Sequence, residues 1–149
     1  MAGLDRCAEP STLLLHGSAV RLGDKGVLLL GASGSGKSDL ALQLIDRGAV
    51  LIADDQVRIS TVDGRLRAAA PASLAGLIEV RDLGILRLAH GEGFLDLVVE
   101  LERGKVEERL PPPVTRAWCG VSLPVIRLDS RAPSAAAKIR VALQAGRVA

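Results

Sequence analysis

The chain has 149 residues, of which 48% are hydrophobic, and this is the usual size and apolar content of one domain with one buried core. Lys and Arg number 19 against 17 Asp and Glu, and the basic residues are dispersed, so the composition does not indicate nucleic-acid binding. With one Phe, one Trp and no Tyr, the chain also lacks aromatic side chains on which single strands could stack. We therefore expect a single domain over residues 1–149, with an aliphatic core.

The N-terminus and the hydropathy pattern predict a cytoplasmic protein. Residues 1–6 carry one acidic and one basic side chain and lead to no long apolar stretch, which is not the pattern of a signal peptide. No apolar run approaches the length of a membrane span. Cys7 and Cys119 lie far apart without metal-ligand spacing, and we interpret both as reduced thiols.

The first part of the chain predicts a strand, a helix and a second strand. An apolar stretch at residues 11–22 indicates short extended pieces, and the continuous apolar run 27–30 is typical of a strand buried on both faces. Between residues 38 and 47 apolar side chains recur at helical spacing, and Gly48 follows as the helix end. Because another apolar run covers residues 49–53, we expect a β-α-β crossover with parallel strands.

The rest of the chain predicts mainly strands. They are expected at residues 57–61, 66–70, 77–81, 85–88, 94–101 and 123–128. Asp63 and Gly64 predict a hairpin turn between the first two, and the prolines at 111–113 indicate a loop within the domain. Ser134 is expected to cap a final helix that runs to about residue 145, with Gly146 after it. The predicted fold class is α/β, with a mixed sheet and few helices.

A glycine-rich motif follows the first buried strand. It consists of Gly31, Ala32, Ser33, Gly34, Ser35, Gly36, Lys37 and Ser38. Its glycines let the backbone bend tightly and bring N–H groups close to phosphate oxygens, and the following helix N-terminus adds partial positive charge. In such a loop Lys37 neutralises the β- and γ-phosphates, and the Ser38 hydroxyl ligates Mg²⁺. The motif therefore predicts a P-loop for ATP or a related donor, with Mg²⁺.

An acidic pair follows the second predicted strand. Asp54 and Asp55 come directly after the apolar run 49–53. Because both strands of a right-handed β-α-β unit point the same way, we expect the pair at the same sheet edge as the phosphate loop. One carboxylate there can hold the metal through water, and the other can accept the proton of an attacking hydroxyl. Without a phosphate loop nearby, the pair would be an ordinary solvated turn.

Three further residues each fit two interpretations. Glu79 and Arg81 are two apart in a predicted strand, so they share the face opposite Ile78 and Val80. A metal ligand beside a phosphate clamp has this geometry, and so does a solvent-facing pair on a half-buried sheet. His16 follows a leucine run, where a lone histidine is commonly a hydrogen-bonded structural residue. Residue spacing alone leaves these alternatives open.

Together, these segments resemble the catalytic domain of the HPr kinase/phosphorylase family. The resemblance is carried by His16-Gly17, the glycine-rich loop, Arg47-Gly48, Ala53-Asp54-Asp55 and Glu79-Val80-Arg81-Asp82-Leu83-Gly84-Ile85. It covers His16 to Leu88 well and continues weakly to the end of the chain. The resemblance implies a P-loop nucleotide-binding domain of the HPr kinase type.

Members of this family transfer phosphate to a serine of HPr, a small phosphocarrier protein of a phosphotransferase system, and can reverse the step with inorganic phosphate. The resemblance implies site residues that match by position. They are His16, Lys37, Asp55 and Arg109 for catalysis, and Ser38 and Glu79 for Mg²⁺. Asp55 matches the base that takes the serine proton. The implied partner is an HPr-like phosphocarrier protein, and the implied cofactors are ATP and Mg²⁺.

The chain also departs from the family pattern. It looks like a short form without the N-terminal domain of longer members, and Asp82 stands where the signature usually has glycine. The basic segment that the family links to dephosphorylation is represented only by residues 123–127 and the residues after them. The resemblance therefore supports kinase activity better than phosphorylase activity. Longer members assemble as hexamers, so a homo-oligomer stays open for this chain.

The function has three candidate hypotheses. The first is an ATP-dependent, Mg²⁺-requiring serine kinase of an HPr-like carrier. The second is a P-loop kinase of a small hydroxylated metabolite, which would not bind a carrier protein. The third is a nucleotide-sensing module without catalysis, which would need neither Asp55 nor Glu79. A GTPase is disfavoured because the chain contains no asparagine and so has no Asn-Lys-x-Asp motif. We expect no nucleic-acid or membrane partner.

Overall fold

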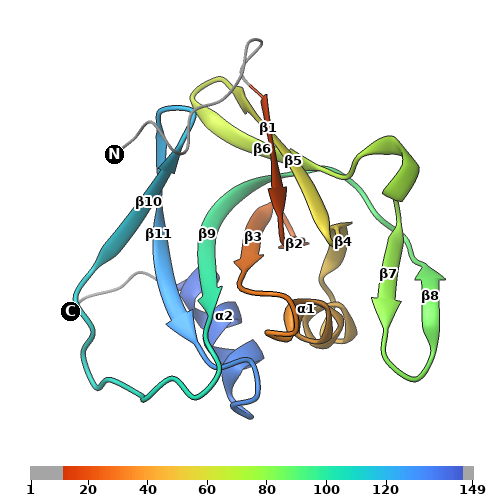
Figure 1. Ribbon diagram of the computed structural model, residues 1–149. Helices are drawn as coiled ribbons and strands as arrows, with labels where there is room; N and C mark the ends of the chain where they lie inside the picture. Colours follow the sequence, from red (N-terminus) through yellow and green to blue (C-terminus); the bar gives the residue numbers. More distant parts are fainter. Residues whose placement is uncertain (1–11, 146–149) are drawn as a thin grey trace.

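The structure is a computed structural model that describes residues 12–145. Within these residues the apolar runs form strands, and the two segments of helical periodicity form helices (Figure 1). The strands are β1 (Thr12–His16), β2 (Ser18–Leu22), β3 (Lys25–Leu30), β4 (Val50–Ala53), β5 (Gln56–Val62), β6 (Arg65–Ala69), β7 (Leu77–Val80), β8 (Gly84–Arg87), β9 (Gly93–Leu101), β10 (Val114–Trp118) and β11 (Val121–Leu128). The helices are α1 (Lys37–Asp46), the short 3-10 helix η2 (Ala72–Leu74) and α2 (Ala135–Gln144).

Strand β9 is the centre of the main sheet because three strands pair with it. The strand order is β1-β5-β6-β9-β3-β2-β4, and β11, followed by β10, branches from β9. The first residues of β9 pair with β6, whereas its last four residues pair in parallel with β11. Strand β3 runs parallel to β9 along most of its length. Strands β7 and β8 form a separate hairpin, which Figure 1 shows beyond α1.

The expected β-α-β crossover is present, with one strand inserted between its two strands. Strand β2 lies between β3 and β4 and is antiparallel to both. Strands β3 and β4 are therefore parallel to each other, as expected, although they do not pair. Since β9 and β11 share this direction, the loops after four strands meet at one edge of the sheet.

The core lies on both faces of the central strands. On one face, Leu40 of α1 and Ile139 of α2 pack with Leu29 of β3. On the other face, Leu28 of β3 belongs to a cluster that contains Trp118 of β10. Leu28 and Leu29 are both fully buried, as the continuous apolar run predicts. Helix α1, which follows the phosphate loop, is thus held against the sheet, and Figure 1 shows it beside α2.

Most predicted elements are confirmed, with boundaries shifted by one or two residues. The sequence does not predict β10, which follows the prolines at 111–113 and pairs with β11 from Val114 to Trp118. Ser134 precedes α2 as expected, but its side chain makes no capping hydrogen bond. Gly146 lies outside the described residues. The two helices and the mixed sheet agree with the predicted fold class.

The expectations about the compartment have different outcomes. Cys119 is disulfide-bonded, so the interpretation as a reduced thiol is wrong for this residue. Cys7 and residues 1–6 lie outside the described residues. In the part of the chain that the structure describes, no helix is long and apolar enough to cross a membrane.

Candidate active site

The loops after the parallel strands meet in one polar pocket of about 320 Å³. The phosphate loop follows β3 and the acidic pair follows β4, while residues 102–104 and 129–131 follow β9 and β11. The lining residues are Ser18, Ser33, Gly34, Ser35, Gly36, Lys37, Ser38, Asp39, Gln43, Asp54, Asp55, Glu79, Arg81, Arg103, Ser130 and Arg131. This position, beyond the carboxyl ends of parallel strands, is where open α/β sheets bind ligands.

The phosphate loop has the backbone conformation that its glycines allow. Gly34 and Gly36 have φ angles of 80° and 95°, which side chains with a Cβ rarely adopt. A Cβ at Gly36 would also lie against the hydroxyl of Ser130. Lys37 is the first residue of α1, and its Nζ donates to the carbonyl oxygens of Gly31 at 2.7 Å and Ala32 at 3.1 Å. The ammonium group is thus held at the loop that would bind phosphate.

Asp54 is a buried carboxylate that accepts three hydrogen bonds. It is 5% exposed, and its Oδ1 accepts from the hydroxyls of Ser18 at 2.6 Å and Ser38 at 2.8 Å. Its Oδ2 accepts from the backbone N–H of Glu79 at 3.3 Å. These bonds connect Asp54 to strand β2, to the end of the phosphate loop and to strand β7. A buried carboxylate with several donors is fixed in position as well as satisfied.

Asp55 differs from Asp54 in its burial and in its hydrogen bonds. Its side chain is exposed at the pocket, and among residues 12–145 its carboxylate makes no hydrogen bond. Its backbone has a φ of 71°, a left-handed conformation that Asp tolerates, and its carbonyl oxygen accepts from Gly17 N–H at 3.1 Å. The backbone is therefore anchored by Gly17, while the exposed side chain lines the pocket.

Glu79 and Arg81 also reach the pocket from the β7–β8 hairpin. Glu79 is exposed between Ile78 and Val80, which are buried, so the predicted alternation is confirmed. The turn that follows holds Asp82 at a φ of 70°. Asp enters the left-handed region more easily than most residues, so Asp82 can occupy this turn position, for which the resemblance described above implies glycine.

Six residues of the pocket lining were not predicted as site residues from the sequence: Ser18, Asp39, Gln43, Arg103, Ser130 and Arg131. Arg103 Nε donates to the carbonyl oxygen of Gly34 at 3.1 Å, and the Ser130 hydroxyl donates to that of Ser35 at 2.5 Å. Arg131 lines the same pocket, as does the buried Ser18. Arg103 and Ser130 each follow a predicted strand within two residues. Only the parallel direction of β9 and β11, which a sequence does not reveal, brings those strand ends to the phosphate loop.

Four predicted site residues lie outside the pocket lining. Gly31 and Ala32 begin the phosphate loop, where their carbonyl oxygens accept from Lys37. His16 ends β1, is exposed and pairs with Gln56 of β5. Arg109 lines a second, larger groove of about 1150 Å³ between the loop after β9, strand β11 and α2. The structure thus brings together the P-loop, Asp54, Asp55, Glu79 and Arg81, and the catalytic roles of His16 and Arg109 stay predictions.

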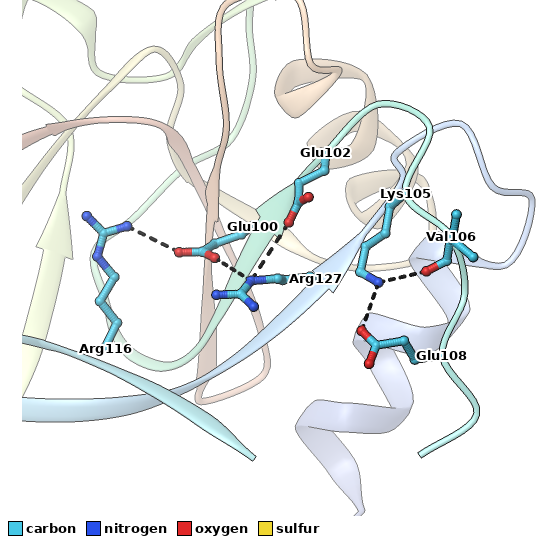
Figure 2. A network of polar contacts seen from close by, with 7 residues as sticks. All are labelled: Glu100, Glu102, Lys105, Val106, Glu108, Arg116 and Arg127. Carbon is cyan, nitrogen blue, oxygen red and sulfur yellow. Dashed lines mark hydrogen bonds and ion pairs between the residues drawn. The ribbon is translucent and has the colours of Figure 1, made fainter. Parts of the chain in front are cut away.

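Ion pairs border this second groove (Figure 2). Glu100 of β9 accepts from Arg116 at 3.3 Å and from Arg127 at 3.0 Å, and the hydrogen bond to Glu100 raises the pKa of Arg127. Lys105 pairs with Glu108 at 3.4 Å. The cations drawn in Figure 2 are therefore matched by carboxylates.

The donor set beside the phosphate loop fits Mg²⁺. Ser38, Asp54 and Glu79 offer only oxygen ligands, which this hard cation prefers. The described residues contain no group of three or more His, Cys, Asp or Glu arranged to hold a metal by themselves. That is the usual situation for Mg²⁺ in phosphotransferases, where one or two carboxylates act together with substrate phosphates and water.

Comparisons with known proteins identify the family of the chain. The family model of the HPr serine kinase C-terminal domain matches residues 9–111. The HPr kinase/phosphorylase of Caldicellulosiruptor bescii is 43% identical over 107 residues, which cover 64% of this chain and 34% of that protein. The enzyme of the same name from Clostridium tetani is 37% identical over 113 residues, or 70% of this chain and 37% of that protein. The chain thus spans about a third of the length of these relatives.

The fold has a match among solved structures. The Hpr(Ser) kinase/phosphatase from Coxiella burnetii aligns with a TM-score of 0.77 over 89% of this chain and 94% of that chain, at 23% sequence identity. The matched family region contains the phosphate loop, the acidic pair, the β7–β8 hairpin and Arg103. The chain belongs to the HPr serine kinase C-terminal domain family.

Proposed function

We propose that the protein is a Mg²⁺-dependent kinase that transfers the γ-phosphoryl group of ATP to a serine of an HPr-like phosphocarrier protein. The observation that supports this best is that the two carboxylates of the acidic pair differ in burial and hydrogen bonding. Asp54 is buried and holds the Ser38 hydroxyl at 2.8 Å, whereas Asp55 presents an unpaired carboxylate to the same pocket. The acceptor is suggested by the name of the two relatives, HPr kinase/phosphorylase.

Binding of the nucleotide would use the phosphate loop and the start of α1. Backbone N–H groups of the loop and the positive end of α1 bind phosphate oxygens. Lys37 would exchange its two carbonyl contacts, at 2.7 and 3.1 Å, for phosphate oxygens, since it already lies at the loop. Charge spread over the transferring group is then stabilised by groups that were in place before binding.

Proton transfer would use Asp55. Its carboxylate can accept the proton of the acceptor serine as the hydroxyl oxygen attacks the γ-phosphorus, and the anchored backbone limits its movement. Asp54 is less accessible to an attacking hydroxyl, because it is buried and its oxygens already accept three hydrogen bonds. Ser38, Asp54 and Glu79 would hold Mg²⁺, which when bound neutralises charge on the phosphates.

The test is incubation of the purified chain with labelled ATP, Mg²⁺ and an HPr-like carrier. The carrier's serine-to-alanine variant is the matched control. Label on the wild-type carrier alone supports the proposal. ATP binding without label on the carrier contradicts it and favours a metabolite kinase or a nucleotide-sensing module. Release of pyrophosphate from the phosphorylated carrier and inorganic phosphate would test the reverse reaction separately.

The remaining parts of the proposal concern the location, the partners and the assembly of the chain. We propose a cytoplasmic location because the proposed reaction uses ATP. Reduced cysteines no longer support this location, since Cys119 is disulfide-bonded. The absence of a nucleic-acid partner and the assembly of a homo-oligomer stay predictions. Analytical ultracentrifugation of the purified chain measures the second directly.

A further inference from the structure

Arg103 lies at the phosphate loop but contacts it through one atom only. It follows the last residue of β9 by two positions, and its Nε donates to the carbonyl oxygen of Gly34 at 3.1 Å. Among residues 12–145 its guanidinium makes no other hydrogen bond, and the residue is exposed at the pocket. The two terminal nitrogens of the guanidinium therefore keep their donors for a ligand.

The backbone beside Arg103 is fixed by contacts that do not involve the side chain. The N–H of Gly104 donates to Asp129 Oδ2 at 2.8 Å, and the N–H of Glu102 donates to the carbonyl oxygen of Leu128 at 2.9 Å. Asp129 is itself held by the backbone and side chain of Arg131. These bonds lower the pKa of Asp129 to about 2, so the carboxylate is charged at neutral pH. The loop that carries Arg103 is thus tied to the loop after β11.

Nearby cations show by contrast what a purely structural arginine does in this region. Arg127 donates to Glu100 at 3.0 Å and lies within 3.8 Å of Glu102, as Figure 2 shows. Arg116 also pairs with Glu100, at 3.3 Å. Arg103, by comparison, is next to a carbonyl oxygen of the anion-binding loop and has no carboxylate partner among the described residues. The positive charge of Arg103 is therefore not neutralised by a carboxylate of the described residues.

We infer that Arg103 is a phosphate-binding residue of this site, in addition to Lys37. Its guanidinium, held at the loop by the Gly34 carbonyl oxygen, would contact the phosphate chain of a nucleotide in this pocket. The chemistry that it recognises is a polyphosphate, for which the planar fork of arginine donors is well matched. The inference rests on the proposed use of ATP and is independent of the acceptor.

The experiment is a calorimetric titration of Mg²⁺–ATP into the full chain and three variants. Arg103→Ala is expected to weaken binding by about tenfold to a hundredfold, the usual effect of losing a hydrogen bond to a charged group. Arg103→Lys should recover part of the loss, because it keeps the charge without the fork. Arg67→Ala is the control. It removes an arginine on β6, outside the pocket, that pairs with Glu92, and should leave the affinity within about twofold. Thermal melts check that each variant is folded.

The outcomes separate this inference from the proposed function. The inference is overturned if Arg103→Ala binds Mg²⁺–ATP within about twofold of wild type. It is also overturned if Arg67→Ala loses as much affinity, because the loss would then reflect the net charge of the protein and not a contact at the loop. If the wild type labels the carrier and Arg103→Ala binds ATP normally, the function stands and the inference falls. If the wild type binds ATP, Arg103→Ala does not, and the carrier stays unlabelled, the inference stands and the acceptor is wrong. A wild type that does not bind ATP contradicts both.

Discussion

Replacing Asp54 by asparagine should destabilise the fold even without nucleotide. The amide oxygen can take the place of Oδ1 and still accept from Ser18 and Ser38, but as a neutral acceptor. The amide nitrogen then takes the place of Oδ2 and faces the N–H of Glu79, so that one bond becomes two opposed donors. Losing the charge on two bonds and the third bond altogether amounts to about 2–4 kcal/mol. For a chain of this size the melting temperature falls by roughly 5–15 °C.

The neighbouring residue supplies the control for this experiment. Asp55→Asn removes the same charge one position along, from an exposed carboxylate without a hydrogen bond in the described part of the chain. Asparagine also tolerates the left-handed φ of 71° at this position, so the backbone is not strained. We expect its stability within about 0.5 kcal/mol of wild type. Urea and thermal unfolding of both variants measure the difference, and equal midpoints for Asp54→Asn and Asp55→Asn would refute the role assigned to the buried carboxylate.

Three other predictions concern turnover, the phosphate loop and acid stability. Asp55→Asn should keep the affinity for ATP and lower the rate of phosphoryl transfer by about 10²–10⁴, the contribution of a general base; calorimetry and single-turnover labelling measure both, and a normal rate removes Asp55 from the mechanism. Gly36→Ala should destabilise the chain by more than Gly64→Ala. Both positions have a positive φ, 95° and 76°, so each substitution costs about 1–2 kcal/mol of backbone strain, but only the Cβ at position 36 also clashes with a neighbour. Thermal melts of the two variants measure the difference. The pKa of Asp129 is lowered from 3.8 to about 2 by hydrogen bonds from Arg131, so its stabilising contribution is present above pH 4 and is lost as the pH falls towards 2. Asp129→Asn should therefore flatten the dependence of the urea midpoint on pH in that window, and an unchanged slope contradicts the ion pair.

Local sequence patterns are sufficient to predict the phosphate-binding half of the site. The glycine-rich motif predicts its own loop because only glycine adopts φ angles near 80° and 95° without strain, and the helix that follows is specified by its apolar spacing. Asp54 and Asp55 could be placed at the same edge because a strand, a helix and a second strand fix direction within about 25 residues. Nothing local indicates that Asp54 is buried and Asp55 exposed, since two adjacent carboxylates look alike in a sequence.

The other half of the site depends on tertiary structure. Arg103 and Ser130 lie 69 and 95 residues from their partners in the phosphate loop, and they reach it because β9 and β11 are parallel to β3. Strand direction across such separations is decided by which apolar faces pack together, and a periodic pattern reports burial but not neighbours. The motif, the helix and the acidic pair were therefore determined by the sequence on its own. The contacts of Asp54 and the approach of Arg103 were decided only by the tertiary structure, through the packing of the β7–β8 hairpin and the parallel pairing of β3 and β11 with β9.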